Sequence, residues 1–458
     1  MKYIIAFTSL ILSMIFVKPE PLLKYDLDKG VKIISTYSGK FNSINIFHSI
    51  ITKNKNTDTY SIKTFIKNQS KVTEFSNEKS PTEPEILAHH FLNDNLYIIV
   101  KNEMHLMAIE INPAEKKSKL EKLGALEEAE YVANISDRTI IFNTDKDENR
   151  IEVYAVAGNN LEKSIISYPE GFKEKRAFVG PIDYINQSKY VESGSNNSAN
   201  LYQLNDQSLA MVLSDEEKNL TVMAIGNSNN NSQKASKTYA FDTEVTEAID
   251  GDYYVYDNKL FKLGLTKEKI AMSIFDVTNG QLLKSISMDD FIANSNATQK
   301  EVEKYAKKLK RSAFDPVLTV NENSDGNYIV RIDYVDNRVY NYDFMFHQQM
   351  MMQQQMMNNS IPKFGPNPPE AYIETSLTAD EGNSFKFVLS PDLEFKSNSN
   401  LRPAVKDYEN RDQLNKQINH KNRSKVTGVF TKNTLHLAYY NTYKGEVTIA
   451  EEPREVED

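Results

Sequence analysis

The sequence predicts an all-β fold, and three observations support this prediction. The chain of 458 residues is rich in Tyr (25) and Phe (22) and lacks Trp, and aromatic and β-branched residues favour strands. From residue 40 onward, short apolar stretches alternate with turns rich in Asn, Asp, Gly and Ser. The third observation is that these stretches come in pairs that recur along the chain.

Each pair consists of a strand of five or six residues, a polar turn and a second strand. The pairs lie at 44–65, 95–111, 138–158, 208–226, 252–265, 327–346, 371–390 and 426–450. Their starting points are separated by 43 to 75 residues. A spacing of about 40–50 residues between β units is typical of a β-propeller, and insertions explain the larger intervals.

One direct repeat supports this interpretation. The segment "VYAVAGNNLEKSI" (153–165) aligns without gaps on "IFDVTNGQLLKSI" (274–286), and each contains a short strand, a tight turn and a second strand. The second copy resembles the strand–Asp–x–x–Gly–strand end of many propeller blades. The chain is therefore similar in architecture to extracytoplasmic β-propeller proteins, and this resemblance implies a single propeller of seven or eight blades. Two β-sandwich domains are the alternative.

The N-terminus has the pattern of a signal peptide. Lys2 precedes an uncharged, mostly apolar run at 3–17, which Lys18 closes. This run is shorter than the roughly 20 residues that a membrane-spanning helix needs, and its charge pattern fits an export signal. We therefore predict a signal peptide at 1–20, either cleaved or kept as an anchor, and a linker or first strand at 21–39. The protein is expected to be periplasmic, secreted or associated with the cell surface.

The β-propeller-like domain is predicted to span 40–450, followed by an acidic tail at 451–458. A helical insertion is predicted at 296–311, because Thr298 and Glu301 form a capping box before an apolar stripe. Weaker helical patterns occur at 405–420 and 113–123.

Composition excludes several classes of function. The net charge of −9 argues against nucleic acid as a partner. The absence of Cys excludes disulfides, thiolate nucleophiles and Cys-based metal sites. The chain also lacks G-x-S-x-G, H-E-x-x-H, Walker and G-x-G-x-x-G motifs, so no catalytic residue can be named from it.

Two turns carry oxygen ligands at the alternating positions of a calcium loop. The candidate ligands are Asp145, Asp147 and Asn149 in the first turn, and Asn321, Asn323 and Asp325 in the second. The first turn has Arg150 where a calcium loop has Gly, and the second has Ile332 at the twelfth position. Ordinary turns before strands are the alternative.

A Met-, Gln- and Pro-rich loop is predicted at 347–369. Six of the 14 methionines lie within 13 residues around its start, and clustered thioethers are ligands for Cu(I). The copper candidates are His347, Met350, Met352 and Met356. A loop without a ligand and an apolar surface for a partner or membrane are the alternatives. The adjacent His89 and His90 would point to opposite faces of a strand, which argues against joint metal binding.

These observations lead us to expect an exported, non-catalytic β-propeller that binds or scaffolds a protein, a glycan or a small ligand. A protein or cell-envelope partner is expected, with no cofactor beyond the candidate Ca²⁺ and Cu(I) sites and no membrane span after signal cleavage. An extracytoplasmic propeller hydrolase or lyase is the alternative, since propeller active sites gather residues from distant blades. A copper-handling protein is a further alternative.

Overall fold

The computed structural model describes residues 20–454 with several gaps. The gaps are 42–44, 69–70, 77–78, 136, 146–149, 168–182, 186–198, 206–207, 215–219, 226–235, 240–249, 267–268, 296–297, 310–313, 337–384, 402–410 and 432. The chain divides into two compact units. The first unit contains residues Met1–Glu127 and Asp407–Asp458, and the second contains Glu128–Lys406.

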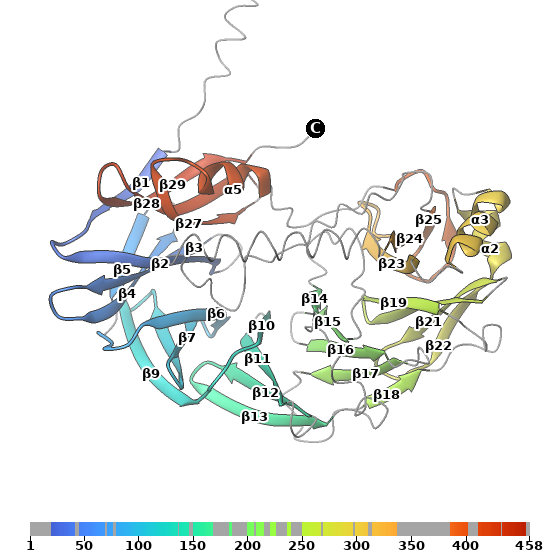
Figure 1. The fold of residues 1–458 in the computed structure, drawn as a ribbon, viewed down its shortest axis with the longest axis horizontal. Helices are drawn as coiled ribbons and strands as arrows, with labels where there is room; N and C mark the ends of the chain where they lie inside the picture. Colours follow the sequence, from blue (N-terminus) through green and yellow to red (C-terminus); the bar gives the residue numbers. More distant parts are fainter. Residues whose placement is uncertain are drawn as a thin grey trace, which may run out of the picture. The chain divides into compact units, whose positions relative to one another are not determined.

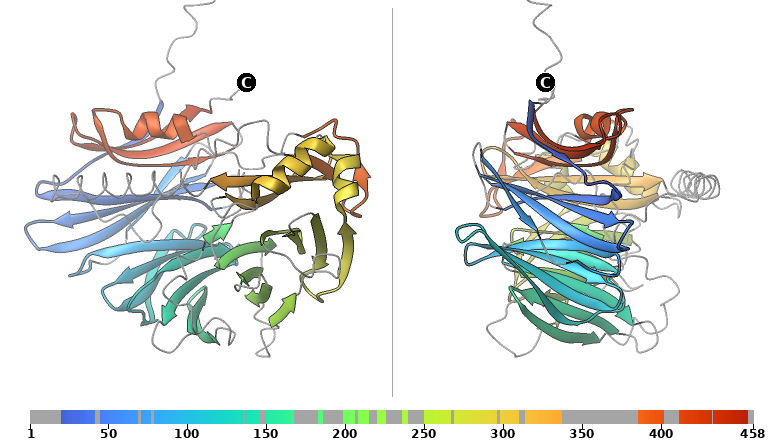
Figure 2. Two further views of the ribbon diagram at one scale, coloured as in Figure 1. Left: turned by 45° about the vertical axis from the view of Figure 1, so that its right-hand side comes forward. Right: turned by 90° about the vertical axis from the view of Figure 1, so that its left-hand side faces the viewer.

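The first unit contains three four-stranded antiparallel sheets (Figure 1). The terminal sheet, as we call it, joins the first described strand to the last three, in the spatial order β1 (Glu20–Asp26), β29 (Glu446–Pro453), β28 (Thr434–Asn441) and β27 (Arg423–Phe430). The second sheet contains β2 (Val31–Lys40), β3 (Ile46–Asn54), β4 (Thr59–Asn68) and β5 (Lys71–Ser76). The third contains β6 (Pro84–Leu92), β7 (Asn95–Asn102), β8 (His105–Asn112) and β9 (Lys117–Ala125). Figure 2 shows these sheets stacked in this order.

The second unit contains four sheets, each built from consecutive strands. The first has β10 (Tyr131–Ile135), β11 (Arg138–Asp145), β12 (Arg150–Ala157) and β13 (Asn160–Ser167). The next has five strands, β14 (Asp183–Ile185), β15 (Ala199–Asn205), β16 (Ser208–Ser214), β17 (Leu220–Ile225) and β18 (Ser236–Tyr239), with β14 parallel to β15. The third has β19 (Asp250–Tyr256), β20 (Lys259–Leu265), β21 (Ile270–Asp276) and β22 (Leu282–Ile286). The fourth has β23 (Phe314–Glu322), β24 (Tyr328–Asp336), β25 (Phe385–Leu389) and β26 (Phe395–Lys396).

These seven small sheets confirm the predicted fold class, an all-β propeller. Strands adjacent in the sequence are adjacent in each sheet, whereas β-sandwiches connect their strands in Greek-key order. The eight predicted pairs give seven sheets because 327–346 and 371–390 contribute to the same one. Ile332 of the first segment pairs with Phe385 of the second.

The direct repeat corresponds to equivalent strands of two sheets. Residues 153–165 fall on the hairpin of β12 and β13, and residues 274–286 fall on the hairpin of β21 and β22. Each hairpin supplies the third and fourth strands of its sheet. The sequence alignment therefore identifies equivalent hairpins, although their pairing differs by one residue: Val153 pairs with Ser164, whereas the aligned Ile274 pairs with Lys284 beside a bulge.

Burial follows the order of strands within a sheet. In β7, five consecutive residues from Leu96 to Val100 are buried, since both faces of this strand are covered. In the outer strand β9 every residue is exposed or only partly buried. Strands covered on both faces read as continuous apolar runs, and this explains why the middle strands gave the strongest sequence signal.

In the part of the chain that the structure describes, three helices pack against the sheets (Figure 2). In the second unit, α2 (Met288–Asn294) begins with a Ser287–Asp290 capping box, and α3 (Gln299–Leu309) lies within the predicted range 296–311. The Thr298 N–H donates to Glu301 Oε2 at 2.7 Å, and the Glu301 N–H donates to Thr298 Oγ1 at 3.4 Å, as the capping pattern predicts. In the first unit, α5 (Arg411–Ile418) lies against β27 and falls within the predicted range 405–420.

The helix predicted at 113–123 is wrong. Residues 113–116 form a turn, and Lys117–Ala125 is the strand β9, which pairs with β8. Lys and Glu favour helices only weakly, and cross-strand pairing overrides that preference here.

Candidate functional site

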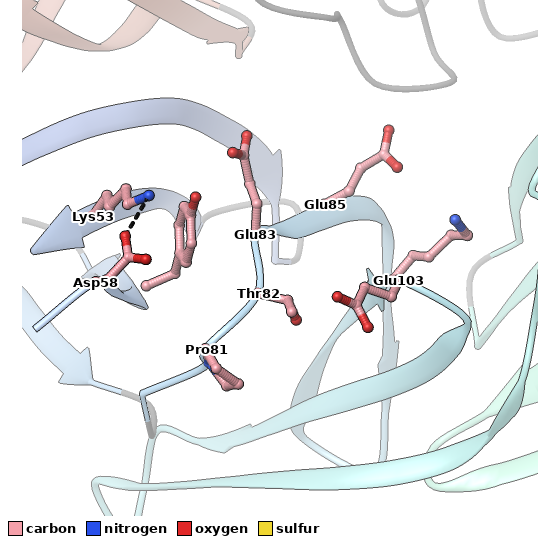
Figure 3. A pocket seen from close by; sticks show the side chains of 9 residues that line it. Lys53, Asp58, Pro81, Thr82, Glu83, Glu85 and Glu103 are labelled. Carbon is pink, nitrogen blue, oxygen red and sulfur yellow. Dashed lines mark ion pairs between the residues drawn. The ribbon is translucent and has the colours of Figure 1, made fainter. Parts of the chain in front are cut away.

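A depression lies at one end of the β2–β5 and β6–β9 sheets, within the first unit (Figure 3). Its volume is about 360 Å³, and we call it the acidic depression. Its charged and aromatic lining comes from three chain segments and consists of Lys53, Asp58, Tyr60, Glu83, Glu85, Lys101 and Glu103. Four carboxylates against two ammonium groups leave an excess of two negative charges.

The hairpin of β3 and β4 fixes the first side of the depression. Lys53 and Tyr60 are cross-strand partners, and Asp58 occupies the turn with a left-handed φ of 52°. Lys53 Nζ lies 2.6 Å from Asp58 Oδ1 and 4.9 Å from the centre of the Tyr60 ring. The hydrogen bond to Asp58 raises the pKa of Lys53 above its usual range. The lining thus already holds one ammonium group between a carboxylate and an aromatic face.

The segment before β6 fixes the second side. Ser80 and Tyr60 exchange backbone hydrogen bonds of 2.7 and 2.8 Å, and Asn102 Nδ2 donates to Ser80 Oγ at 2.7 Å. Asn102 also pairs with the hydroxyl of Thr82. These bonds hold the chain that carries Glu83, which lies between the Lys53–Asp58 pair and Glu85 in Figure 3.

A half-buried lysine stands near Glu83. Burial lowers the pKa of Lys425, and nearby Lys32 lowers it further, whereas Glu83 raises it. Lys425 has a left-handed φ of 52° in a bulge of β27, and its carbonyl accepts a 2.5 Å hydrogen bond from Thr36 Oγ1. Glu83 therefore interacts electrostatically with Lys425 in addition to lining the depression.

In the second predicted calcium turn, the candidate ligand Asn323 forms hydrogen bonds within the turn itself. Asn323 Oδ1 accepts hydrogen bonds of 3.0 Å from the backbone N–H groups of Asp325 and Asn327. Asn400 Nδ2 lies 2.9 Å from Asp325 Oδ2, and Gly326 has a left-handed φ of 78°. Asn321 lies on β23. These contacts describe a hairpin turn, and the calcium site stays a prediction.

The other predicted metal sites fall largely outside the described residues. Asp145 ends β11, but Asp147 and Asn149 lie in an undescribed segment. All four copper candidates, His347, Met350, Met352 and Met356, lie in the gap 337–384. Among the described residues, no group of three His, Asp or Glu side chains is arranged to hold a metal ion.

His89 and His90 take separate partners. Tyr37 Oη lies 2.9 Å from His89 Nδ1, and His89 Nε2 lies 3.1 Å from the carbonyl oxygen of Lys40. His90 stacks on Tyr97 with ring centres 5.2 Å apart. The two imidazoles contact different neighbours, as their adjacent positions in β6 suggest.

Sequence reasoning missed the acidic depression because its lining comes from residues up to 50 positions apart. The available signal was the concentration of charged residues in the segments 53–58, 83–85 and 101–103, at the ends of strands. Charged residues at strand ends are common, so this signal becomes specific only when the sheets bring the three segments together.

Comparison with known proteins supplies no family. No family model and no curated protein matches the sequence. Among solved structures, the WD40 domain of SCAP from fission yeast matches with a TM-score of 0.22 and 9% identity, covering 59% of this chain and 89% of that domain. An acylaminoacyl peptidase of Pyrococcus horikoshii matches with a TM-score of 0.28 and 9% identity, over 68% of this chain and 46% of the peptidase.

A putative 6-phosphogluconolactonase from Bacteroides uniformis matches with a TM-score of 0.24 and 11% identity, over 63% of this chain and 77% of that protein. Similarities at these TM-scores transfer no function to this chain. Within the described part of the chain, no helix is long and apolar enough to cross a membrane.

Proposed function

We propose that this protein is an exported β-propeller that acts as a binding module, and that the acidic depression receives a positively charged group of its ligand. The observation that carries the proposal is the convergence of four carboxylates and the Tyr60 ring in one open depression. The charge pattern of residues 2–18 supports the exported location.

The Lys53–Asp58–Tyr60 arrangement indicates which ligand group fits. Ammonium and guanidinium groups are attracted both by carboxylates and by the face of an aromatic ring. Lys53 makes both kinds of contact within the protein, and Glu83, Glu85 and Glu103 extend the negative lining beyond it. The complementary ligand is a chain segment with several Lys or Arg side chains.

The expected affinity is modest and requires several contacts. An exposed ion pair contributes only about 0.2–1 kcal/mol, so a single cation would bind weakly. A basic peptide that engages three carboxylates together would bind measurably and would dissociate as salt is raised.

Fluorescence anisotropy with fluorescein-labelled deca-lysine tests the proposal. We expect binding at 0.05 M salt that weakens at 0.5 M salt. Changing Glu83, Glu85 and Glu103 to Lys should raise the Kd at least tenfold, or about 1.4 kcal/mol. The matched control changes Glu115, Glu127 and Glu128 to Lys, which alters the net charge equally at exposed sites outside the depression. Equal weakening in both variants would show non-specific attraction and contradict the proposal.

The exported location is tested by the mature N-terminus. Because β1 begins at Glu20 and pairs with β29, we expect the exported protein to keep Glu20, so that cleavage falls at least one residue earlier than the predicted signal peptide 1–20 implies. Peptide mass spectrometry of the extracytoplasmic fraction identifies the first residue, and an intact Met1 on cytosolic protein would contradict export.

A further inference from the structure

Four polar side chains meet between the terminal sheet and the β2–β5 sheet, and we call them the histidine cluster. They are His48 on β3, Lys67 on β4, His436 on β28 and Glu451 on β29. His436 and Glu451 are cross-strand partners, with Nδ1 and Oε1 2.8 Å apart. The same Glu451 oxygen accepts a hydrogen bond from Lys67 of the neighbouring sheet. One carboxylate therefore links the two sheets.

The histidine cluster continues an apolar contact between the same sheets. Ile50, Phe65, Ala438 and Ile449 belong to one buried hydrophobic cluster. Each lies two residues from a member of the histidine cluster on the same strand, and residues two apart share a face. The polar side chains thus occupy one end of the contact that holds the terminal sheet.

Both imidazoles are buried and neutral at neutral pH. Only 1% of His48 and 5% of His436 is exposed. Burial lowers the pKa of His48 to about 3, and His436 and Lys67 add to this effect. Burial lowers the pKa of His436 to about 4, although Glu451 opposes the shift. Ser38 Oγ, 2.6 Å from His48 Nδ1, and Thr431 Oγ1, 3.3 Å from His436 Nε2, are uncharged partners.

We propose that the histidine cluster is an acid-sensitive latch, which holds the terminal sheet on the β2–β5 sheet at neutral pH and releases it on acidification. At neutral pH the cluster contains one ammonium group and one carboxylate, which compensate each other. Protonation of both imidazoles adds two positive charges beside Lys67 in a space with little water. Burying uncompensated charge is costly, so the open state, in which water solvates the imidazoles, becomes favoured.

The direction and range of the effect follow from proton linkage. An imidazole in the open state takes up a proton near pH 6.5, whereas in the closed state it does so only near pH 3 or 4. The latch is therefore fully effective above pH 6.5 and weakens as the pH falls. Each histidine changes the opening constant by about tenfold per pH unit in this range, so at pH 4.5 the two together should increase opening by about 10³-fold or more.

Hydrogen exchange of the full-length protein, followed by mass spectrometry, tests the latch. We expect protection factors of β28 and β29 amides, corrected for intrinsic exchange, to fall at least a hundredfold between pH 7.5 and pH 4.5. Amides of β20 and β21 in the second unit should change less than tenfold. His89 gives the contact with the β6–β9 sheet a weaker acid response of its own, since burial lowers its pKa to about 4.

Two variants and one direct titration complete the test. His48→Gln combined with His436→Gln should remove most of the pH dependence in β28 and β29, whereas the exposed control His105→Gln should behave like the wild type. Retained pH dependence in the double variant would overturn the proposal. If the double variant does not fold, the pKa values of His48 and His436 in the wild type can be measured from hydrogen exchange at the imidazole C2 position. Values near 6.5 at both residues would overturn the latch.

Discussion

The two units build the same kind of sheet but fill the contacts between sheets differently. In the second unit, aromatic and aliphatic residues such as Tyr254, Phe261 and Phe387 form a continuous buried cluster. In the first unit, the contact of the terminal sheet ends in the histidine cluster. Six of the seven histidines lie in the first unit, and the second unit contains only His347.

This difference shows that one architecture can carry two kinds of response. Apolar burial does not depend on proton concentration, because no group changes its charge. A contact that requires neutral imidazoles loses stability as the pH falls below 6.5. We therefore expect acid to act on the first unit before it acts on the second.

The largest expected effect comes from opening the aromatic core of the second unit. Phe387 is fully buried, with its ring centre 5.5 Å from that of Phe291 and 5.7 Å from that of Phe395. Phe387→Ala should reduce the free energy of unfolding by about 3–5 kcal/mol, because it leaves a cavity. Urea unfolding followed by circular dichroism measures this loss at pH 7.5 and pH 5.5.

The same loss is expected at both pH values. Leu282→Ala is the control, since this side chain on β22 is 43% exposed and should cost less than about 0.5 kcal/mol. A loss for Phe387→Ala that changes strongly between the two pH values would break the comparison, because it would show a titrating core in the second unit.

The sequence predicted the strands of both units better than it predicted either polar site. Apolar runs such as Leu96–Val100 identify middle strands because burial on both faces demands them. The histidine cluster could not be predicted, since His48 and His436 are 388 positions apart and meet only when β1 and β27–β29 form one sheet beside β2–β5. The predicted helix at 113–123 failed for a related reason, because pairing with β8 outweighs local preference.

A smaller loss of stability is expected from removing the Asp276 side chain in the second unit. The stability that this side chain contributes should also depend on pH in a different range from that of the histidine cluster. Asp276 Oδ1 accepts hydrogen bonds of 2.7 Å from the Thr278 N–H and 2.5 Å from its hydroxyl, and the bond to the Thr278 side chain lowers the pKa of Asp276. Asp276→Ala should lower the free energy of unfolding by about 1 kcal/mol at pH 7. Because the folded-state pKa is lowered, this contribution persists at pH 4.5 and is lost only as the pH falls below about 3.8.

Urea unfolding of Asp276→Ala and Asp276→Asn at pH 7 and pH 4.5 checks this expectation. The Asn variant keeps an acceptor oxygen and should retain part of the stability. If Asp276→Ala and the wild type have equal free energies of unfolding at pH 4.5, the stabilisation by Asp276 is already lost at that pH. The second unit would then respond to acid in the same range as the first, and the proposed contrast would fail.

The smallest effect is expected for the Met-rich segment 347–369, which lies in the sequence between two paired strands of the second unit. The flanking strands β24 and β25 pair directly, and Val330 and Phe387 are partners with no exposed surface. We predict that this pairing supplies the stability and that the segment contributes little to it. A five-residue Gly/Ser linker in place of 347–369 shortens the connection 337–384 from 48 to 30 residues. Loop-closure entropy then changes the free energy of unfolding by only about 0.4 kcal/mol.

The melting temperature of this deletion variant, followed by circular dichroism, should therefore stay within a few degrees of the wild-type value. A loss on the scale of Phe387→Ala would show that the methionines belong to the core of the second unit. A parallel Cu(I) titration separates the remaining alternative. Micromolar or tighter binding by the wild type that is lost when Met350, Met352 and Met356 are changed to Leu would support the copper site, even if stability does not change.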